Sequence, residues 1–228
     1  MKRSQINRII RESIAFLNRQ NFHLPPFAFF TPQQWAQAGH EYDEIRDNML
    51  GWDITDYGQD DFEHIGLTLF TIRNGNLKNP AYTKPYAEKI LISLPGQVTP
   101  EHFHWSKTED IICRGGANLI MKLYASDENE AHAHGPVTVS IDGRRVALPS
   151  GTQLELKPGE SITLPTGLYH SFWAPEGGEP CLIGEVSMVN DDKTDNRFYK
   201  AQGRFPKIEE DEPAHWLLCS EYPAAPAD

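Results

Sequence analysis

The feature that most constrains the fold is a succession of short apolar segments between residues 66 and 189. They are rich in β-branched and aliphatic residues, and Gly, Pro, Asn or Asp separates each from the next, which is typical of strands joined by turns. The Asp142-Gly143 pair between two of them favours a tight hairpin. Many short strands in succession predict an antiparallel sandwich or barrel. The segments read LTLFTI, KILISL, NLIMKLY, VTVSI, TQLEL, SITLP and CLIGEVSMV.

The first 60 residues show helical rather than strand periodicity. Ile6, Ile10 and Phe16 fall near helical spacing, with charged side chains on the other faces. Thr31-Pro32 is typical of a helix start, because Thr caps free N–H groups and Pro is tolerated in the first turn. A further short helix is expected from Glu41 to Leu50. We therefore expect a helical N-terminal segment packed outside a mainly β barrel.

Charge and composition argue against several classes of protein. The formal net charge of -11 argues against binding to nucleic acid or to anionic membranes, which both require a concentrated basic surface. No stretch approaches the ~20 apolar residues that span a bilayer, and the N-terminus lacks the apolar core of a signal peptide. The 3 cysteines are widely separated, so a disulfide framework is not expected. These features predict a cytoplasmic enzyme or binding protein.

Histidines and one carboxylate follow a pattern typical of a metal site. In the stretch GQVTPEHFHWSKTEDIICRGG, His102 and His104 lie two residues apart and therefore point to one face of a strand. Glu109 follows a turn-like WSKT and can return a carboxylate to the same ion. The later stretch GESITLPTGLYH adds His170. Three imidazoles and one carboxylate leave positions open on a six-coordinate ion, and they suit Mn²⁺ or Fe²⁺, with Zn²⁺ and Co²⁺ as alternatives.

A second H-x-H pair, His132 and His134, lies in the polar segment ASDENEAHAHG. This segment has no apolar alternation, and no later histidine is spaced to complete a ligand set. Its composition predicts a solvated loop.

The spacing G-x5-H-x-H-x4-E-x6-G, followed by G-x5-P-x-G-x2-H, resembles the two motifs of the cupin superfamily and matches every fixed position. The one departure is Ala174, where the second motif usually ends in Asn, a position that does not bind metal. The resemblance implies a jelly-roll-like cupin β-barrel with one divalent metal. The implied ligands are His102, His104, Glu109 and His170.

On this basis we expect a single cupin domain over residues 1–228. Residues 1–60 would form the helical extension and residues 61–200 the metal-binding barrel. Residues 201–228 would form a C-terminal tail. We expect its acidic and proline-containing part, from Glu209 to Asp228, to be loosely packed.

Two further side chains are predicted to take part in catalysis. Glu185 lies in the strand segment CLIGEVSMV, where it shares one face with Ile183 and Ser187. Directed inward, near a metal, its carboxylate would suit a general base; the alternative is an outward position on the sheet surface. Lys107, between His104 and Glu109, would lie beside the metal and could donate a hydrogen bond to a substrate hydroxyl or an enolate oxygen.

Four more residues are candidates for binding substrate. Lys89 lies on an alternating strand face and is either inward or a surface charge. The segment VNDDKTDNRF, directly after the Glu185 strand, concentrates side chains that bind hydroxyl groups. Its Asp192, Asp195 and Arg197 could hold a polyol chain, although a simple turn would explain the same composition.

Two carboxylates, a lysine and an oxygen-seeking metal suit an aldose–ketose isomerisation. A base would move a proton between C1 and C2 through a metal-bound cis-enediol, and the metal would stabilise the enediolate charge. A hydride shift would use many of the same groups. The segments GWDITDYG, GLTLFTIRNG, HFHWSKTEDI and GEVSMVNDDKTDNRF resemble the D-lyxose isomerase family, and the similarity covers most of the chain.

This resemblance implies interconversion of D-lyxose with D-xylulose and of D-mannose with D-fructose. It also implies one divalent metal per subunit, commonly Mn²⁺, and a homodimer. Three other functions stay open: a cupin Fe(II) dioxygenase, a phosphosugar isomerase and a non-catalytic sugar-binding cupin. A phosphosugar site would require a cluster of cations, whereas the lysines and arginines of this chain are scattered.

Overall fold

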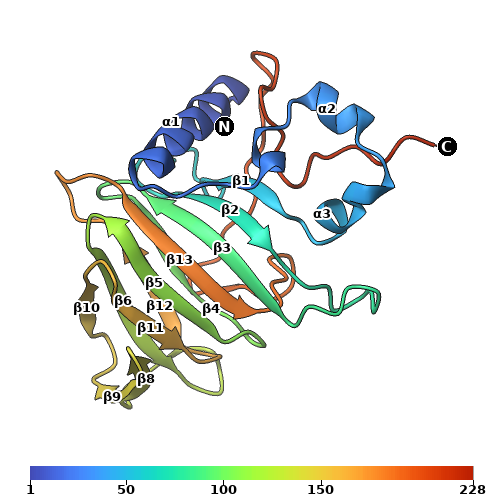
Figure 1. Cartoon of the computed structure of the whole chain (residues 1–228). Helices are drawn as coiled ribbons and strands as arrows, with labels where there is room; N and C mark the ends of the chain where they lie inside the picture. Colours follow the sequence, from blue (N-terminus) through green and yellow to red (C-terminus); the bar gives the residue numbers. More distant parts are fainter. Residues whose placement is uncertain (228) are drawn as a thin grey trace.

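The computed structural model describes residues 1–227, which form two β-sheets and a group of helices (Figure 1). The helical elements are α1 (Arg3–Arg19), η1 (Pro26–Phe29), α2 (Pro32–Gln37), η2 (His40–Tyr42) and α3 (Asp43–Asp47). The strands are β1 (Gly51–Thr55), β2 (Leu67–Arg73), β3 (Tyr86–Ser93), β4 (Val98–Phe103), β5 (Glu109–Gly116), β6 (Leu119–Ser126), β7 (His132–Ala133), β8 (Val137–Ile141), β9 (Arg144–Leu148), β10 (Gln153–Leu156), β11 (Ser161–Leu164), β12 (Tyr169–Trp173), β13 (Cys181–Met188) and β14 (Arg197–Phe198).

The larger sheet has the order β1-β2-β3-β13-β5-β11-β8-β9, and the smaller one has the order β10-β6-β12-β4-β14, with β7 paired to β6. Neighbouring strands are antiparallel, and every predicted strand segment forms a strand. Asp142 and Gly143 both adopt positive φ, 48° and 78°, in the predicted tight turn between β8 and β9. The two sheets curl around a common interior, which confirms the mainly β, cupin-type fold.

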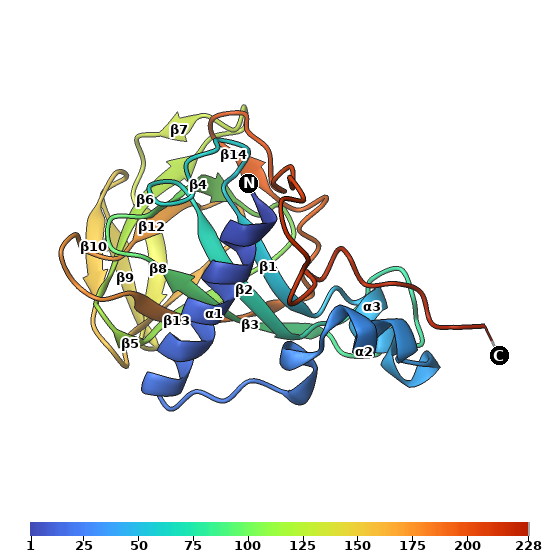
Figure 2. The ribbon, with the colours of Figure 1, turned by 90° about the horizontal axis from the view of Figure 1, so that it is seen from above.

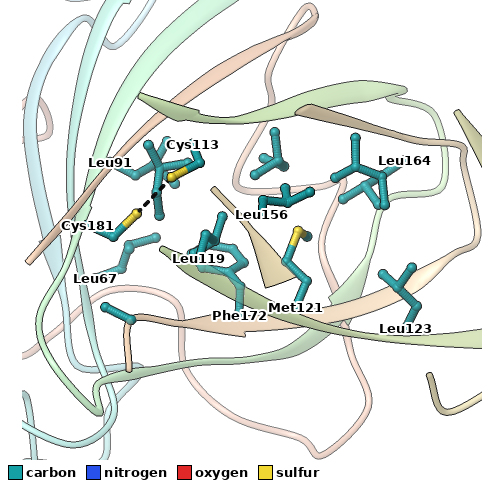
Figure 3. Packing of buried hydrophobic residues seen from close by; sticks show 14 of the residues in the cluster. Leu67, Leu91, Cys113, Leu119, Met121, Leu123, Leu156, Leu164, Phe172 and Cys181 are labelled. Carbon is teal, nitrogen blue, oxygen red and sulfur yellow. Dashed lines mark hydrogen bonds between the residues drawn. The ribbon is translucent and has the colours of Figure 1, made fainter. Parts of the chain in front are cut away.

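The main core fills the space between the two sheets (Figure 3). Leu91, Ile111 and Ile183 come from the larger sheet, and Leu119 and Met121 come from β6 of the smaller one. These side chains alternate with outward-facing residues along their strands, which is the pattern of a sheet with one face on a core. The core also contains two free thiols, those of Cys113 and Cys181, whose Sγ atoms lie 3.8 Å apart.

A second core lies on the outer face of the larger sheet, under α1 (Figures 1 and 2). Ile6 and Ile10 of α1 pack there, and both are 0% exposed. Their partners on the sheet include Trp52 of β1, Phe70 of β2 and Ile90 of β3. Because α1 covers this face, the strands beneath it are buried on both sides.

Ile10→Ala is expected to lower the free energy of unfolding by about 2–5 kcal/mol, because it removes buried methyl groups and leaves a cavity under α1. The exposed neighbouring change Arg11→Ala should alter it by less than about 0.5 kcal/mol. Denaturant unfolding followed by circular dichroism measures both values. Equal stabilities of the two variants would contradict this account of α1.

The predicted helix start at Thr31 is confirmed. Its Oγ1 accepts a hydrogen bond from the Gln34 N–H (3.2 Å), and the Gln34 side chain accepts one from the Thr31 N–H (2.9 Å). The helix predicted from Glu41 to Leu50 is shorter, because only η2 and α3 form there. Among residues 1–227 no helix is both long and apolar enough to cross a membrane.

The expectation of a loosely packed C-terminal tail was wrong. The buried guanidinium of Arg3 pairs with Glu210 (2.6 Å) and with Glu221, and Leu218 and Cys219 are buried as well. A buried guanidinium is costly unless carboxylates pair with it, so the tail supplies the partners that α1 requires.

The second H-x-H pair is also more ordered than predicted. His132 lies in β7, beside Ala125 and Ser126 of β6, and its side chain is 28% exposed. His134 is exposed, as expected of a loop residue. The expectation of a solvated loop therefore holds for His134 and was wrong for His132. Two of the aromatic neighbours of His132, Tyr169 and Tyr199, come from distant parts of the chain.

Candidate metal centre and active site

The three motif histidines lie together at one end of the barrel. His102 in β4 is directly opposite His170 in β12, and His104 follows the end of β4. One ring nitrogen of each lies within 4.8 Å of the others. Gly167 adopts a positive φ of 73°, and its N–H donates to the His104 carbonyl (2.9 Å). That bond joins the second motif to the first.

The hydrogen bonds of these histidines direct their Nε2 atoms toward a common point. Each Nδ1 faces a backbone carbonyl, which can only accept, so Nδ1 carries the proton and Nε2 keeps a free lone pair. Nε2 of His170 is buried and has no hydrogen-bond partner. Buried polar atoms normally have one, so this arrangement fits a bound cation. The carbonyl acceptors are those of Pro100 for His102 (2.8 Å), Asp195 for His104 (2.6 Å) and Leu168 for His170 (3.0 Å).

Glu109, the first residue of β5, adds a carboxylate to the three imidazoles. Its Oε1 lies 3.1 Å from His170 Nε2, and its Oε2 lies 3.4 Å from His104 Nε2. Burial alone would raise the pKa of this carboxyl, but the nearby Lys107 ammonium and His104 hold it well below its usual value. The structure thus brings together all four predicted ligands, with a charged carboxylate among them.

A buried charged cluster lies beside these donors. Glu185 of β13 is directly opposite Lys89 of β3, and its Oε1 lies 2.9 Å from Lys107 Nζ and 3.4 Å from Lys89 Nζ. Lys107 Nζ also lies 2.9 Å from Glu109 Oε2. Lys107 therefore connects the metal donors to Glu185. Both Glu185 and Lys89 point into the barrel, on the face that the strand alternation predicted.

The charge on Lys107 is secured by its neighbours. Burial lowers the pKa of its ammonium, but the carboxylates of Glu109, Glu185 and Asp192 outweigh that effect and raise the pKa above its ordinary value. Lys107 is thus a proton donor in hydrogen bonds at neutral pH and not a base.

Sequence reasoning missed Asn190, which accepts from both lysines. Its Oδ1 lies 2.6 Å from Lys89 Nζ and 3.1 Å from Lys107 Nζ. Its backbone is held by the buried Asn74, which donates to the Asn190 carbonyl (2.9 Å) and accepts from the Asn190 N–H (3.0 Å). The only signal in the sequence was its place in the VNDD segment, where Asn is equally typical of a turn.

Asp192 and the unpredicted Arg204 form another wall of the site. Asp192 Oδ1 lies 3.6 Å from Lys89 Nζ, and its Oδ2 lies 3.1 Å from Arg204 Nη2. Arg204 Nη2 also pairs with Asp53 Oδ2 (2.6 Å). Burial raises the pKa of Asp192, but Lys89 and Arg204 hold it well below its ordinary value. Arg204 lies in the segment after the predicted barrel, where no motif pointed to a function, so it could not be selected from the sequence.

The other two predicted substrate residues do not line the cavity. Asp195 instead orients a predicted metal ligand and the segment that follows it. Its carbonyl accepts a hydrogen bond from His104 Nδ1, and its Oδ1 accepts one from the Ser106 N–H (2.8 Å). Arg197 points away from the site, where its Nε pairs with Glu130 (2.5 Å). The expectation that Arg197 holds a polyol chain is not supported by this placement.

These groups surround a cavity of about 40 Å³ between the two sheets. Histidines come from the smaller sheet, carboxylates and Lys89 come from the larger one, and the segment between β4 and β5 joins them. Apolar side chains, among them Tyr57, Leu91 and Phe198, form the remaining wall. A larger hollow of about 150 Å³ is lined by Asn190 and Asp192. Asp192 also lines the smaller cavity, but none of the four metal donors lines the larger hollow. The smaller cavity is therefore the candidate active site.

Comparisons with known proteins show which proteins this chain is similar to. A family model described as D-lyxose isomerase matches residues 1–222. The chain is 53% identical over 223 residues to the D-lyxose/D-mannose isomerase of Escherichia coli O157:H7, covering 97% of this chain and 98% of that protein. It is 51% identical over 223 residues to the enzyme of the same name from Serratia proteamaculans, with the same coverage of 97% and 98%. Among solved structures, the L-ribose isomerase of Cellulomonas parahominis has a TM-score of 0.59, covering 92% of this chain and 98% of that one. At 15% identity this likeness concerns the fold alone.

Proposed function

Because this chain belongs to the D-lyxose isomerase family, we propose that it interconverts D-lyxose with D-xylulose, and D-mannose with D-fructose, with the help of one divalent metal ion. The observation that carries the proposal is the buried contact between Lys107, Glu109 and Glu185. Through Lys107, this contact connects the metal donors to the carboxylate of Glu185, which is not one of those donors and is proposed to act on the sugar.

The metal would be held by His102, His104, Glu109 and His170, whose free Nε2 atoms and charged carboxylate fit a cation. We propose Mn²⁺ as the native ion, because mixed imidazole and carboxylate donors suit it. When bound, such an ion acts as a Lewis acid that polarises a sugar carbonyl and so acidifies the neighbouring C–H bond.

Glu185 is proposed as the base that moves the proton. A single carboxylate on one side of an open-chain sugar can remove the C2 proton of the aldose and deliver it to C1, while the O2 hydroxyl proton passes to O1. C1 then becomes a CH2OH group and C2 becomes the carbonyl of the ketose. We assign the intermediate as a cis-enediol, in which O1 and O2 lie on the same side of the C1–C2 bond. Lys107 and Lys89 hold this carboxylate at 2.9 and 3.4 Å, and positioned general bases of this kind contribute typically about 100- to 10,000-fold in rate.

Lys107 is proposed to assist at the sugar oxygen. Its raised pKa keeps it protonated, so it can donate a hydrogen bond to an oxygen on which negative charge develops. Asn190 orients Lys107 and Lys89 together, since its Oδ1 accepts from both ammonium groups.

An uncharged sugar suits this cavity better than a phosphosugar. Each cationic side chain that lines it is paired with a carboxylate: Lys107 with Glu185, Lys89 with Glu185 and Asp192, and Arg204 with Asp192. A phosphate clamp would require cations free to pair with the ligand.

The test is to strip the purified protein of metal, incubate it with D-lyxose or D-mannose, and then restore Mn²⁺ while measuring ketose. We expect ketose only after Mn²⁺ is added. If the metal-bound protein forms ketose from neither D-lyxose nor D-mannose, the proposal is excluded. Oxygen uptake would then favour a dioxygenase, and turnover of phosphorylated sugars alone would favour a phosphosugar isomerase.

We also propose that the protein is a homodimer. Light scattering, which measures the mass of the particle in solution, tests this part of the proposal.

A further inference from the structure

We propose that His132 is a positioning residue of the sugar site, which fixes β14 and the wall that β14 contributes to the cavity. His132 touches none of the metal donors and belongs to the H-x-H pair that the metal site does not use. The inference rests on the proposed function for its effect on turnover. Its structural part, the anchoring of β14, can be tested without any activity.

His132 is stacked between two tyrosines. Its ring lies 4.0 Å from that of Tyr124 with an interplanar angle of 2°, and 3.9 Å from that of Tyr199 with an angle of 9°. Tyr124 belongs to β6, whereas Tyr199 directly follows β14. The imidazole therefore connects the segment that follows β13 to strand β6. His132 and Tyr199 are 67 positions apart in the sequence.

Glu101 adds a polar contact to the same cluster. Its Oε1 lies 2.5 Å from His132 Nε2, and its carbonyl accepts from the Tyr199 N–H (2.9 Å). Glu101 directly precedes the predicted metal ligand His102 in β4. His132, Tyr199 and the start of the metal motif are thus held in one arrangement, which we call the His132 clamp and define as Tyr124, His132, Tyr199 and Glu101.

The clamp acts on the cavity through β14. This strand has only two residues, and Phe198 is directly opposite His102 in β4. The Phe198 ring lies 5.5 Å from the His102 ring and 5.6 Å from the Tyr57 ring, so it forms part of the cavity wall. A two-residue strand forms few ladder hydrogen bonds of its own, and its position depends on contacts from neighbouring side chains.

The loop that carries His132 holds β14 at a second point. Glu130, two residues earlier, accepts from Arg197 Nε (2.5 Å) and from the Trp105 indole N–H (2.8 Å). Its carbonyl accepts from the Tyr169 hydroxyl (2.9 Å). Arg197, which we expected to bind sugar, therefore helps to fix β14.

The segment held in this way carries functional groups on both sides of β14. Asp192 precedes it and Arg204 follows it, and these two line the cavity and pair with each other. Asp195 also precedes β14, but the Ser106 N–H holds its carboxylate without help from β14, so its contact with His104 should persist. Release of β14 should displace the groups that face the sugar hydroxyls. The base Glu185 lies on β13 in the other sheet, so it should be affected much less.

The experiment compares His132→Ala with His134→Ala, a matched control because His134 is exposed and two residues away. With the Mn²⁺-loaded protein and D-lyxose, we expect KM to rise at least tenfold in His132→Ala while kcat changes less than threefold. His132→Phe, which keeps the stack, should recover most of the KM. His134→Ala should match the wild type.

A second readout does not depend on turnover. Trypsin cleavage at the exposed Lys193 and Lys200 should be faster in His132→Ala than in the wild type or in His134→Ala. Equal cleavage rates and equal KM values in His132→Ala and His134→Ala would overturn the inference, as would an unchanged KM with a reduced kcat. If the wild type turns over neither sugar, the proposed function fails and the cleavage rates alone decide whether the clamp exists.

Discussion

Replacing Glu185 with glutamine is expected to lower kcat for the conversion of D-lyxose to D-xylulose by about 100- to 10,000-fold, the usual contribution of a positioned general base. Glutamine has nearly the same shape and can still accept from Lys107 through its amide oxygen, but it cannot take a proton from carbon. The loss should therefore fall on kcat, and sugar affinity should stay within a few-fold of the wild type.

The matched control is Glu88→Gln on the neighbouring strand β3. Glu88 is opposite Val186, one residue beyond Glu185, and pairs with Arg73 (2.9 Å) outside the cavity. We expect wild-type turnover from this variant. Steady-state kinetics give kcat and KM for both, and equilibrium binding of the sugar gives its affinity for Glu185→Gln. Wild-type turnover in Glu185→Gln would remove Glu185 from the mechanism and favour the hydride shift or a base elsewhere.

The same comparison separates an enzyme from a non-catalytic sugar-binding cupin. A binding protein has no proton to move, so Glu185→Gln should change little in it beyond the contacts with Lys107 and Lys89. The position of Glu185 favours an enzyme. Its carboxylate is buried opposite Lys89 of β3 and beside Lys107 of the β4–β5 segment. Three charges buried together are costly to maintain unless they have a role.

The strands, the hairpin turn and the motif glycines of this fold could be predicted from the sequence, because each depends on the residue types within a short segment. Strand periodicity predicted seven of the strands, namely β2, β3, β6, β8, β10, β11 and β13. The positive φ values of Asp142 and Gly143 agree with the hairpin turn that these two residues predicted. The fixed Gly116 of the first motif has a φ of 73°, and a Cβ there would lie 2.1 Å from the Pro180 carbonyl oxygen. This conformation and this close contact allow only glycine at position 116, so the requirement can be recognised in the sequence as part of the motif.

The parts of the site that were missed depend on contacts between distant segments. Asn190 and Arg204 acquire their roles only because the segment after β13 folds back across the barrel, next to Lys89 and Asp53. No periodicity marks β14, since two residues cannot show one. Arg197 was assigned to the sugar because Arg suits hydroxyl groups, whereas the structure gives it a carboxylate partner, Glu130, 67 residues earlier.

His170→Ala is expected to abolish metal binding at micromolar metal and to lower kcat/KM by about a thousandfold or more. A Lewis acid contributes several kcal/mol to the stabilisation of a charged transition state, and each 1.36 kcal/mol corresponds to a factor of ten in rate. His170 is the most informative ligand to remove, because its Nε2 is buried and the one side chain it faces is Glu109 (3.1 Å), itself a proposed metal ligand. Alanine at this position removes one donor without leaving a new buried charge.

The control for this variant is His64→Ala, since His64 is 79% exposed and pairs only with Asp61 on the surface. Metal content after dialysis, measured by mass spectrometry, should fall to background in His170→Ala and stay at one ion per subunit in the control. Thermal unfolding gives an independent measurement, because an ion that binds only the folded state stabilises it by about 2.7 kcal/mol at a hundred times its Kd. Mn²⁺ should therefore raise the Tm of the wild type and of His64→Ala but leave that of His170→Ala unchanged. A His170→Ala protein that keeps both the metal and the Mn²⁺-dependent rise in Tm would show that the ion binds elsewhere, and the role assigned to all four donors would then be wrong.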